Sequence, residues 1–380
     1  MKHPRPPALL TRRGFAGLAA SLGALASPVA AQQLTAPEAA HREGTAPETP
    51  PFQGGLSFTR KVVPLKVRPF ALGKVRLLPG PFLEAQEWNR AYVRRLPPDR
   101  LLHNFRVNAG LPSSASPLGG WEEPKCELRG HFAGHYLSAC ALLYASTGDK
   151  EIKAAGDYTV AEMAKCQAKL GAGGYLSAFP VEFFDRLDAR QRVWAPFYTI
   201  HKIMAGMLDM VQHCGNKQAL ETLQQMAQWA DRWTSGKTEE HLQSILNTEY
   251  GGMNEVLYNL AAATGDVKWA QAGDRFTKKR FFNPLAMRRD ELRGLHANTH
   301  IPQVTGAARR YELSGDMRFH DVADFFWYEI VTARSYATGG TSNGEGWLTQ
   351  PRHLAEELGR SEATAECCCA YNMLKLTRHL

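Results

Sequence analysis

The chain has 380 residues, of which 44% are hydrophobic and 22% charged, values typical of a globular protein with one large domain or two ordinary ones. Its net charge of +8 is modest, and no block of basic residues alternates with aromatic residues, which argues against nucleic-acid binding. Beyond the N-terminal region no stretch of about 18 uninterrupted apolar residues occurs, so no membrane span is expected after removal of a signal sequence.

The first 31 residues have the pattern of an export signal. The pair Arg12-Arg13, with Thr11 before it and Phe15 after it, precedes a short apolar run that ends in the small residues of 29–31. This pattern predicts a twin-arginine signal peptide, with an ordinary secretory signal as the alternative, and a periplasmic or secreted protein. Residues 32–57 are rich in Pro, Ala, Thr, Glu and Gly and predict a disordered linker ahead of a catalytic domain over 58–380.

Weak alternation of apolar residues over 58–80 hints at strands, but a helical repeat dominates the rest of the chain. Four segments with apolar residues three and four apart contain a glycine followed by Asp or Asn. A glycine in the left-handed conformation can end one helix, and the Asp or Asn can cap the next. The pattern therefore predicts helical hairpins that turn at Gly148, Gly215, Gly265 and Gly315, the last three spaced 50 residues apart.

Helical hairpins in series either stack as a solenoid or close into a ring. The segments that look functional lie outside the Gly-Asp turns, mostly near the opposite ends of the hairpins, which favours a ring with its site on one face. The fold class that we expect is all-α, an (α/α)6-type barrel or toroid of helical hairpins, incomplete at the C-terminus.

Several segments gather His, Trp, Tyr and Gly where a plain helix would not need them: residues 119–136, 194–202, 247–255, 294–302 and 338–347. Glycines leave backbone room for a ligand, and aromatic rings can stack on the apolar face of a sugar. His135, His201 and His296 recur beside Gly, Trp or Tyr, which favours a shared substrate-binding pocket over isolated core positions. Trp121 and Trp194 are further candidates for substrate binding, although each could equally be a core residue.

Two glutamates are candidate catalytic residues. Glu345 stands between two glycines, a setting that suits a loop better than the middle of a helix and would display its carboxylate. Glu249 lies next to the paired glycines 251–252 and is a weaker candidate.

The seven cysteines are spaced too irregularly for a disulfide framework, and three of them are consecutive, at 367–369 after Glu366. Thiolate and carboxylate are both zinc ligands, and the spacing of Glu366 and Cys368 lets the two converge on one ion at a helix start. Zinc is therefore the expected cofactor, with Glu366 and Cys368 as two of its ligands. A structural zinc site normally has four ligands, and small buried cysteines remain the alternative interpretation.

Six motifs, taken together, resemble the β-L-arabinofuranosidases of glycoside hydrolase family 127 and the related family 146, over roughly residues 60–380. They are G-H-F-A-G-H-Y-L-S-A, Y-T-I-H-K-I-M-A-G, E-Y-G-G-M-N-E, H-A-N-T-H-I-P, T-G-G-T-S-N-G-E and A-E-C-C-C-A-Y-N-M-L-K-L-T-R. The resemblance implies an α/α barrel and a retaining glycosidase that removes L-arabinofuranose, or a related sugar, from plant polysaccharide or glycoprotein glycans.

The same resemblance implies roles for individual residues. Glu345 matches the acid/base, Glu249 falls in an active-site motif, and Glu366 and Cys368 match two zinc ligands, while His135, His201 and His296 match positions that line the sugar pocket. The zinc-bound cysteine nucleophile of the family belongs to a Cys-Cys pair that would lie beyond Leu380. We therefore expect this chain to be a C-terminally truncated member that is inactive by itself.

Two other functions are compatible with the residues. A different α/α-barrel enzyme, such as a polysaccharide lyase or a glucuronyl hydrolase, would use a Tyr/His pair or paired aspartates without zinc. A non-catalytic carbohydrate-binding helical-repeat protein would tolerate loss of Glu345. All three functions share a carbohydrate partner, and the sequence indicates neither the exact sugar and linkage nor the oligomeric state.

Overall fold

The computed structural model describes residues 46–364 and 366–380, which form one compact unit from Ala46 to Leu380. The predicted signal peptide and most of the predicted linker lie outside these residues. The described part of the chain is all-α, as predicted: it contains helices, two isolated β-bridges and no β-strand. In this part of the chain no helix has both the length and the hydropathy that a membrane crossing requires.

The prediction of strands over 58–80 is wrong, because this segment contains none. Among the described residues this segment has no strand partner: Leu72–Lys74 form a short 3-10 helix, and Lys61 and Val63 donate to the carbonyl groups of Leu313 and Glu312 at the end of a helix, at 2.9 and 2.8 Å.

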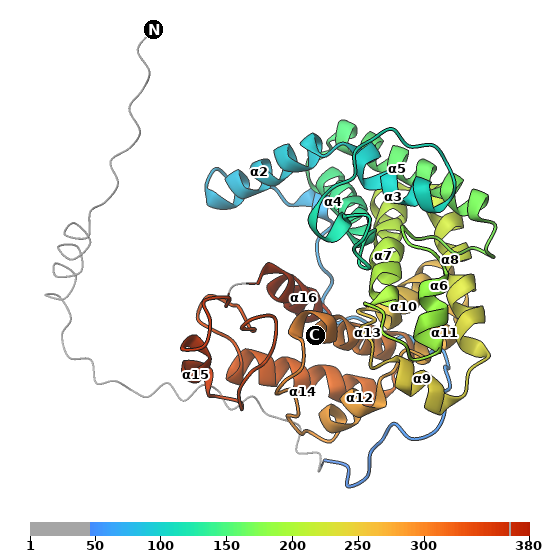
Figure 1. Ribbon diagram of the computed structural model, residues 1–380. Helices are drawn as coiled ribbons and strands as arrows, with labels where there is room; N and C mark the ends of the chain where they lie inside the picture. Colours follow the sequence, from blue (N-terminus) through green and yellow to red (C-terminus); the bar gives the residue numbers. More distant parts are fainter. Residues whose placement is uncertain (1–45, 365) are drawn as a thin grey trace, which may run out of the picture. The chain divides into compact units, whose positions relative to one another are not determined.

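Four helical hairpins form the centre of the fold (Figure 1). They are α4 (His131–Thr147) with α5 (Lys150–Leu170), α7 (Pro196–Cys214) with α8 (Lys217–Ser235), α10 (Met253–Thr264) with α11 (Val267–Asp274), and α13 (Ala297–Ser314) with α14 (Met317–Ala333). The remaining α-helices are α2 (Pro81–Arg95), α3 (Pro98–Asn108), α6 (Glu182–Asp188), α9 (Glu239–Ile245), α12 (Lys279–Ala286), α15 (Leu354–Leu358) and α16 (Cys367–Thr377).

The turns of the hairpins confirm the predicted repeat. Each first helix ends at a glycine with positive φ, between 65° and 80°, where a side chain would be strained. The Asp or Asn that follows accepts a hydrogen bond from a backbone N–H of the next helix. The hairpin positions are therefore determined locally, at Gly148, Gly215, Gly265 and Gly315.

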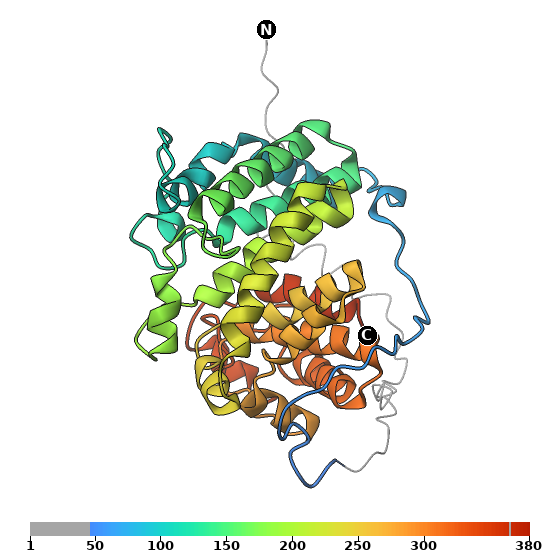
Figure 2. The same ribbon diagram turned by 90° about the vertical axis from the view of Figure 1, so that its right-hand side faces the viewer.

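The first helix of each hairpin lies inside and the second outside. Helices α7, α10 and α13 are buried around most of their circumference, whereas α5 and α8 bury one face. Successive inner helices pack on one another in the order α4, α7, α10, α13 and α16. Figure 2 shows the same succession from the green hairpins to the orange and red helices.

The crossing of α4 and α7 is unusually close because glycines face each other there. A Cβ atom at Gly134 would overlap the carbonyl oxygen of Lys202, and one at Gly206 would overlap the carbonyl oxygen of Gly134. Backbone contact at this point brings the next residue of α4, His135, up to the part of α7 that carries His201.

The compact unit begins within the segment that the sequence predicts to be a linker. Phe52 is buried against Phe282 and Phe319, with ring centroids at 5.8 and 5.1 Å, and its backbone N–H donates to Asn283. The end of that segment, from Ala46 onward, therefore packs with the helices rather than standing apart from them.

Candidate active site

The candidate residues gather at one end of the inner helices, away from the Gly-Asp turns. His131 and His135 lie at the start of α4, Tyr198 and His201 at the start of α7, and Glu249 just before α10. His296 precedes α13, and Glu366 and Cys368 open α16. The prediction that the site lies opposite the hairpin turns is consistent with this arrangement.

Glu345 lies on a loop that is tied to the start of α13. Its backbone has φ +67°, in the left-handed region that neighbouring glycines help the chain to reach. Its carbonyl oxygen accepts a 2.8 Å hydrogen bond from the N–H of Ala297, and the next residue but one, Trp347, donates to Leu295 at 3.1 Å. With its backbone fixed in this way, the side chain of Glu345 remains 56% exposed and can reach a ligand.

His296 lies between the two candidate glutamates. Its Nε2 is 3.2 Å from Oε2 of Glu345, and its Nδ1 is 3.6 Å from Oε1 of Glu249. His296 is also the N-cap of α13, where Nδ1 accepts a 3.3 Å hydrogen bond from the N–H of Thr299. Since Nδ1 is the acceptor in that bond, Nε2 carries the ring proton and donates a hydrogen bond to Glu345. The capping bond at the start of α13 thus fixes the ring of His296, and this ring in turn positions the carboxylate of Glu345.

Of the histidines predicted on α4 and α7, His201 is buried and His135 is partly buried, and both lie near Lys202 and Lys375. Burial and then the nearby Lys202 hold the pKa of both His135 and His201 well below the usual value. Burial, and then Lys375, lower the pKa of Lys202 itself to about 8. At neutral pH both imidazoles are therefore uncharged, so each can both donate and accept a hydrogen bond to a sugar hydroxyl.

The paired glycines before α10 make room for His201. A Cβ at Gly251 would lie 2.6 Å from its Nδ1, and a Cβ at Gly252 would lie 3.0 Å from its Nε2. The buried Nδ1 of His201 has no hydrogen-bond partner among the described residues. An unpaired polar atom of this kind is the feature expected of a group that a ligand satisfies.

The predicted zinc ligands lie together at the start of α16. Oε2 of Glu366 accepts a 3.3 Å hydrogen bond from the hydroxyl of Ser342 and lies 3.2 Å from Sγ of Cys369. Partial burial of the Cys368 thiol, and then Glu366, raise its pKa, although the residue as a whole is exposed. In the described part of the chain, however, no group of three or more His, Cys, Asp or Glu side chains is placed to hold a metal ion. The sulfur contact of the Glu366 carboxylate is thus with Cys369, and the assignment of Glu366 and Cys368 as zinc ligands stays a prediction.

The two predicted tryptophans lie on the loops that lead into the inner helices. The ring of Trp121 is 58% exposed and meets His131 edge-on at 5.8 Å. Ring contacts continue from His131 to His135 at 5.8 Å and to Tyr198 at 6.2 Å, so Trp121 borders the histidine group. Trp194 is 45% exposed, and its backbone N–H donates to Glu127 at 2.8 Å. Its described contacts do not connect it to Glu345.

The sequence analysis missed polar residues that join the inner helices. Nδ2 of Asn298 donates to the hydroxyl of Tyr198 at 3.3 Å, and Oδ1 of Asn298 accepts from Asn372 at 2.9 Å. These bonds connect α7, α13 and α16. Lys375 of α16 also pairs with Glu255 of α10 at 2.6 Å. The signal in the sequence that could have identified these residues is the presence of Asn298, Asn372 and Lys375 within helices that are otherwise largely apolar.

The buried carboxylate of Glu122 fixes the start of α4 and was also not identified from the sequence. Glu122 accepts hydrogen bonds from the backbone N–H groups of Gly130 and Phe132 at 2.6 and 3.0 Å and lies 3.1 Å from Nδ1 of His131. It occupies the positive end of the helix that carries His131 and His135.

Comparison with known proteins identifies the family. The model of the β-L-arabinofuranosidase, glycoside hydrolase family 127 catalytic domain, matches residues 74–380. No curated protein matches the chain in sequence.

Solved structures of this family share the fold. A family 127 β-L-arabinofuranosidase from Geobacillus stearothermophilus T6 superposes with a TM-score of 0.56 at 15% identity, covering 78% of this chain and 51% of its own. A second, the family 127 β-arabinofuranosidase BT3674, has a TM-score of 0.54 at 17% identity and covers 77% and 48%. The chain thus spans about half the length of these proteins, and its fold is the (α/α)6 barrel type of their catalytic domain. The chain belongs to the catalytic-domain family of the glycoside hydrolase family 127 β-L-arabinofuranosidases.

Proposed function

We propose that this chain is part of a retaining β-L-arabinofuranosidase that removes L-arabinofuranose, or a related sugar, from plant polysaccharide or glycoprotein glycans, with Glu345 as its acid/base. Because the chain spans about half the length of its solved relatives, the activity is proposed for the complete enzyme. The observation that carries the proposal is the hydrogen bond from Nε2 of His296 to Glu345, on a loop that also contacts the start of α16 through Ser342 and Glu366.

Glu345 supplies the proton transfers. Its protonated carboxyl donates to the glycosidic oxygen as the leaving group departs, and its carboxylate then removes a proton from the water that releases the sugar. The N–H of His296 remains directed at this carboxylate and stabilises the negative charge that forms after the first proton transfer. The half-exposed position of Glu345 allows both the leaving group and water to reach it.

The histidines of α4 and α7 orient the sugar. Uncharged His135 and His201 offer hydrogen bonds to ring hydroxyls from adjacent inner helices, and Trp121 borders the same group. In the complete enzyme we propose Glu366 and Cys368 as two of the zinc ligands, with the remaining ligands and the nucleophilic cysteine after Leu380. When bound, zinc favours the thiolate form of a cysteine ligand.

Leaving-group dependence tests the role of Glu345. With the complete enzyme, we expect Glu345→Gln to lower kcat/KM for a natural glycosidic linkage by about 10²–10⁴-fold, the usual contribution of general acid catalysis. A substrate with an activated aryl leaving group needs no proton and should lose far less. Equal losses on both substrates, or no loss on either, would count against an acid/base role, and a parent protein that hydrolyses neither substrate would favour a non-catalytic binding protein.

We also propose that the protein is exported by the twin-arginine route. The support is the sequence pattern around Arg12 and Arg13, which lies outside the described residues. That route carries folded proteins, which suits an enzyme that acquires a metal before export.

A further inference from the structure

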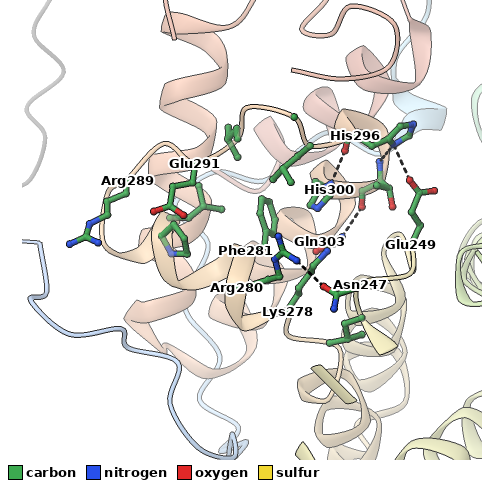
Figure 3. A pocket seen from close by; sticks show the side chains of 17 residues that line it. Asn247, Glu249, Lys278, Arg280, Phe281, Arg289, Glu291, His296, His300 and Gln303 are labelled. Carbon is green, nitrogen blue, oxygen red and sulfur yellow. Dashed lines mark hydrogen bonds and ion pairs between the residues drawn. The ribbon is translucent and has the colours of Figure 1, made fainter. Parts of the chain in front are cut away.

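A pocket is lined in part by His296, whereas Glu345 is not among its lining residues. It has a volume of about 440 Å³, within the range of small-molecule sites, and lies between α12, the loop before α13 and the segment that carries Glu249 (Figure 3). Glu249 and His296 belong to its lining, so the pocket adjoins the candidate catalytic residues. Lys278, Phe281 and His300 lie deeper in it.

Lys278 places a buried positive charge in this pocket. The residue is only 8% exposed, and no ion pair or hydrogen bond of its ammonium group is found among the described residues, although Nζ itself is not one of the fully buried atoms. The adjacent Lys279 shows the contrast, because it pairs with Glu239 at 2.6 Å and donates to the carbonyl group of Gly54 at 2.6 Å. A buried cation without a partner is costly, and an anionic ligand would remove that cost.

His300 adds a hydrogen-bond acceptor beside this charge. Its Nδ1 lies 2.7 Å from the carbonyl oxygen of His296, which can only accept, so Nδ1 carries the proton and Nε2 carries a lone pair. That Nε2 is buried and has no partner among the described residues. Burial and then the charge of Lys278 lower the pKa of His300 to about 3, so the ring stays neutral. The hydroxyl of Thr299, also in the lining, is likewise buried and unpaired.

Several other polar groups of the lining already have partners, whereas the exposed Arg289 and Glu291 have no side-chain partner among the described residues. The side-chain amide of Gln303 donates to the backbone carbonyl group of Thr299 at 3.0 Å and accepts from the hydroxyl of Tyr250 at 2.7 Å. The guanidinium group of Arg280 donates to the side-chain oxygen of Asn247 at 3.2 Å. Among the buried groups of the lining, what remains open to a ligand is one ammonium group with a nearby imidazole acceptor and a hydroxyl. A carboxylate on a carbon framework that also carries hydroxyl groups complements this set, since the carboxylate pairs with the ammonium and a hydroxyl donates to the imidazole.

We propose that this pocket is a subsite for a carboxylated sugar, so that the enzyme acts on arabinofuranose attached to an acidic glycan. The proposal rests on the function proposed above and specifies its substrate class. The ring centroids of Phe281 and His300 lie 4.7 Å apart in an edge-on arrangement. Phe281 provides the apolar wall against which the sugar ring would lie.

The charge of Lys278 gives this subsite a pH dependence. Burial and then Arg280 lower the pKa of Lys278 to about 8, while Glu249 acts in the opposite direction. The other titratable or charged groups that face the pocket are Arg289, Glu291, His296 and His300. A bound carboxylate pairs with the protonated ammonium only, so the affinity should fall as the pH rises above about 8.

Calorimetric titration of the 380-residue chain with D-galacturonate, D-galactose and inorganic phosphate tests the subsite. We expect galacturonate to bind at least tenfold more tightly than galactose at pH 7, and this preference to disappear in Lys278→Met. Lys278→Arg, which keeps the charge, and Lys217→Met, which removes an exposed charge elsewhere, should retain it. Equal affinity for the two sugars, an undiminished preference in Lys278→Met, or phosphate binding as tight as that of galacturonate would overturn the proposal.

Failure of this inference is distinguishable from failure of the proposed function. Binding of galacturonate requires no turnover, and hydrolysis of a neutral aryl β-L-arabinofuranoside by the complete enzyme requires no acidic group. Galacturonate binding without arabinofuranoside hydrolysis would refute the proposed function and retain the acidic-sugar site. Hydrolysis without a preference for the acidic sugar would refute the site alone.

Discussion

Glu345 and His296 are joined twice, once through their side chains and once through the backbone beside them. Nε2 of His296 lies 3.2 Å from Oε2 of Glu345, and the residue after His296, Ala297, donates its N–H to the carbonyl oxygen of Glu345 at 2.8 Å. An antiparallel bridge between His296 and Gly346 completes the connection. The loop that displays the carboxylate is therefore positioned by the first turn of α13.

His296 has two separable roles, which two substitutions distinguish. His296→Ala removes both the N-cap of α13 and the donor to Glu345, and we expect it to cost about 1 kcal/mol of unfolding free energy as well as activity. His296→Asn restores the cap but does not reach Glu345, so it should recover the stability while kcat/KM remains lowered by about tenfold or more. Denaturant unfolding and steady-state kinetics of both variants give the comparison. Full activity in His296→Asn would show that the capping role alone matters.

The glycine contact between α4 and α7 predicts a large effect for one methyl group. Gly134→Ala places a Cβ against the carbonyl group of Lys202, and we expect a loss of about 1–3 kcal/mol in unfolding free energy even though alanine is the better helix former. Gly236→Ala is the matched control, because nothing lies within 4 Å of its added Cβ and φ there is negative. If both variants unfold at the same denaturant concentration, the close crossing does not determine the position of His135.

Lys278 should make the protein less stable at neutral pH than at alkaline pH. Its pKa in the folded protein is about 8, below the 10.5 of an ordinary lysine, so the unfolded chain holds the proton more tightly between these values. Stability should therefore rise with pH from about 8 to 10.5, and the difference in pKa corresponds to about 3 kcal/mol.

The substitution Lys278→Met should raise the unfolding free energy below pH 8 and flatten this increase, because it removes the buried charge. Chemical denaturation at pH 7.5 and 9.5 for both proteins measures the effect, and the variant difference isolates Lys278 from the other titrating groups. A Lys278→Met protein that is less stable than the parent at pH 7.5 would contradict the unpaired charge on which the acidic-sugar subsite depends.

Export should depend on the arginine pair. Replacing Arg12 and Arg13 together with lysine is expected to leave the protein in the cytoplasmic fraction of a bacterial host, whereas the parent reaches the periplasm or the medium. Fractionation and immunoblotting measure the distribution. Unchanged export of the double variant would favour the ordinary secretory route.

The fold could be predicted from the sequence because its determinants are local. A glycine and the Asp or Asn after it are enough to end one helix and start another, and all four predicted turns have this geometry in the structure. The helical period of the flanking residues then indicates which faces are buried. Phe52 shows the limit of this approach. The residues around it in the sequence have the composition of a linker, yet its ring is buried against Phe282, which lies 230 residues further along the chain.

Residues of the candidate site could be proposed from the sequence where glycine and aromatic residues mark them, but not where contacts join helices that are distant in the chain. The glycines beside Glu345 indicated a loop, and those at 251–252 proved to make room for His201. The pairing of Lys375 with Glu255, or the isolation of Lys278, depends on packing between segments far apart in the chain. No spacing in the sequence shows which lysine has a partner.

Azide trapping with Glu345→Ala in the complete enzyme tests the assignment of this residue most directly. Without the carboxylate to deprotonate water, an activated aryl β-L-arabinofuranoside should form the covalent intermediate and then release it slowly. We expect azide to accelerate turnover and to yield an arabinofuranosyl azide with retained anomeric configuration, because azide needs no general base. An inverted azide product, or no response to azide at all, would contradict Glu345 as the acid/base of a retaining enzyme.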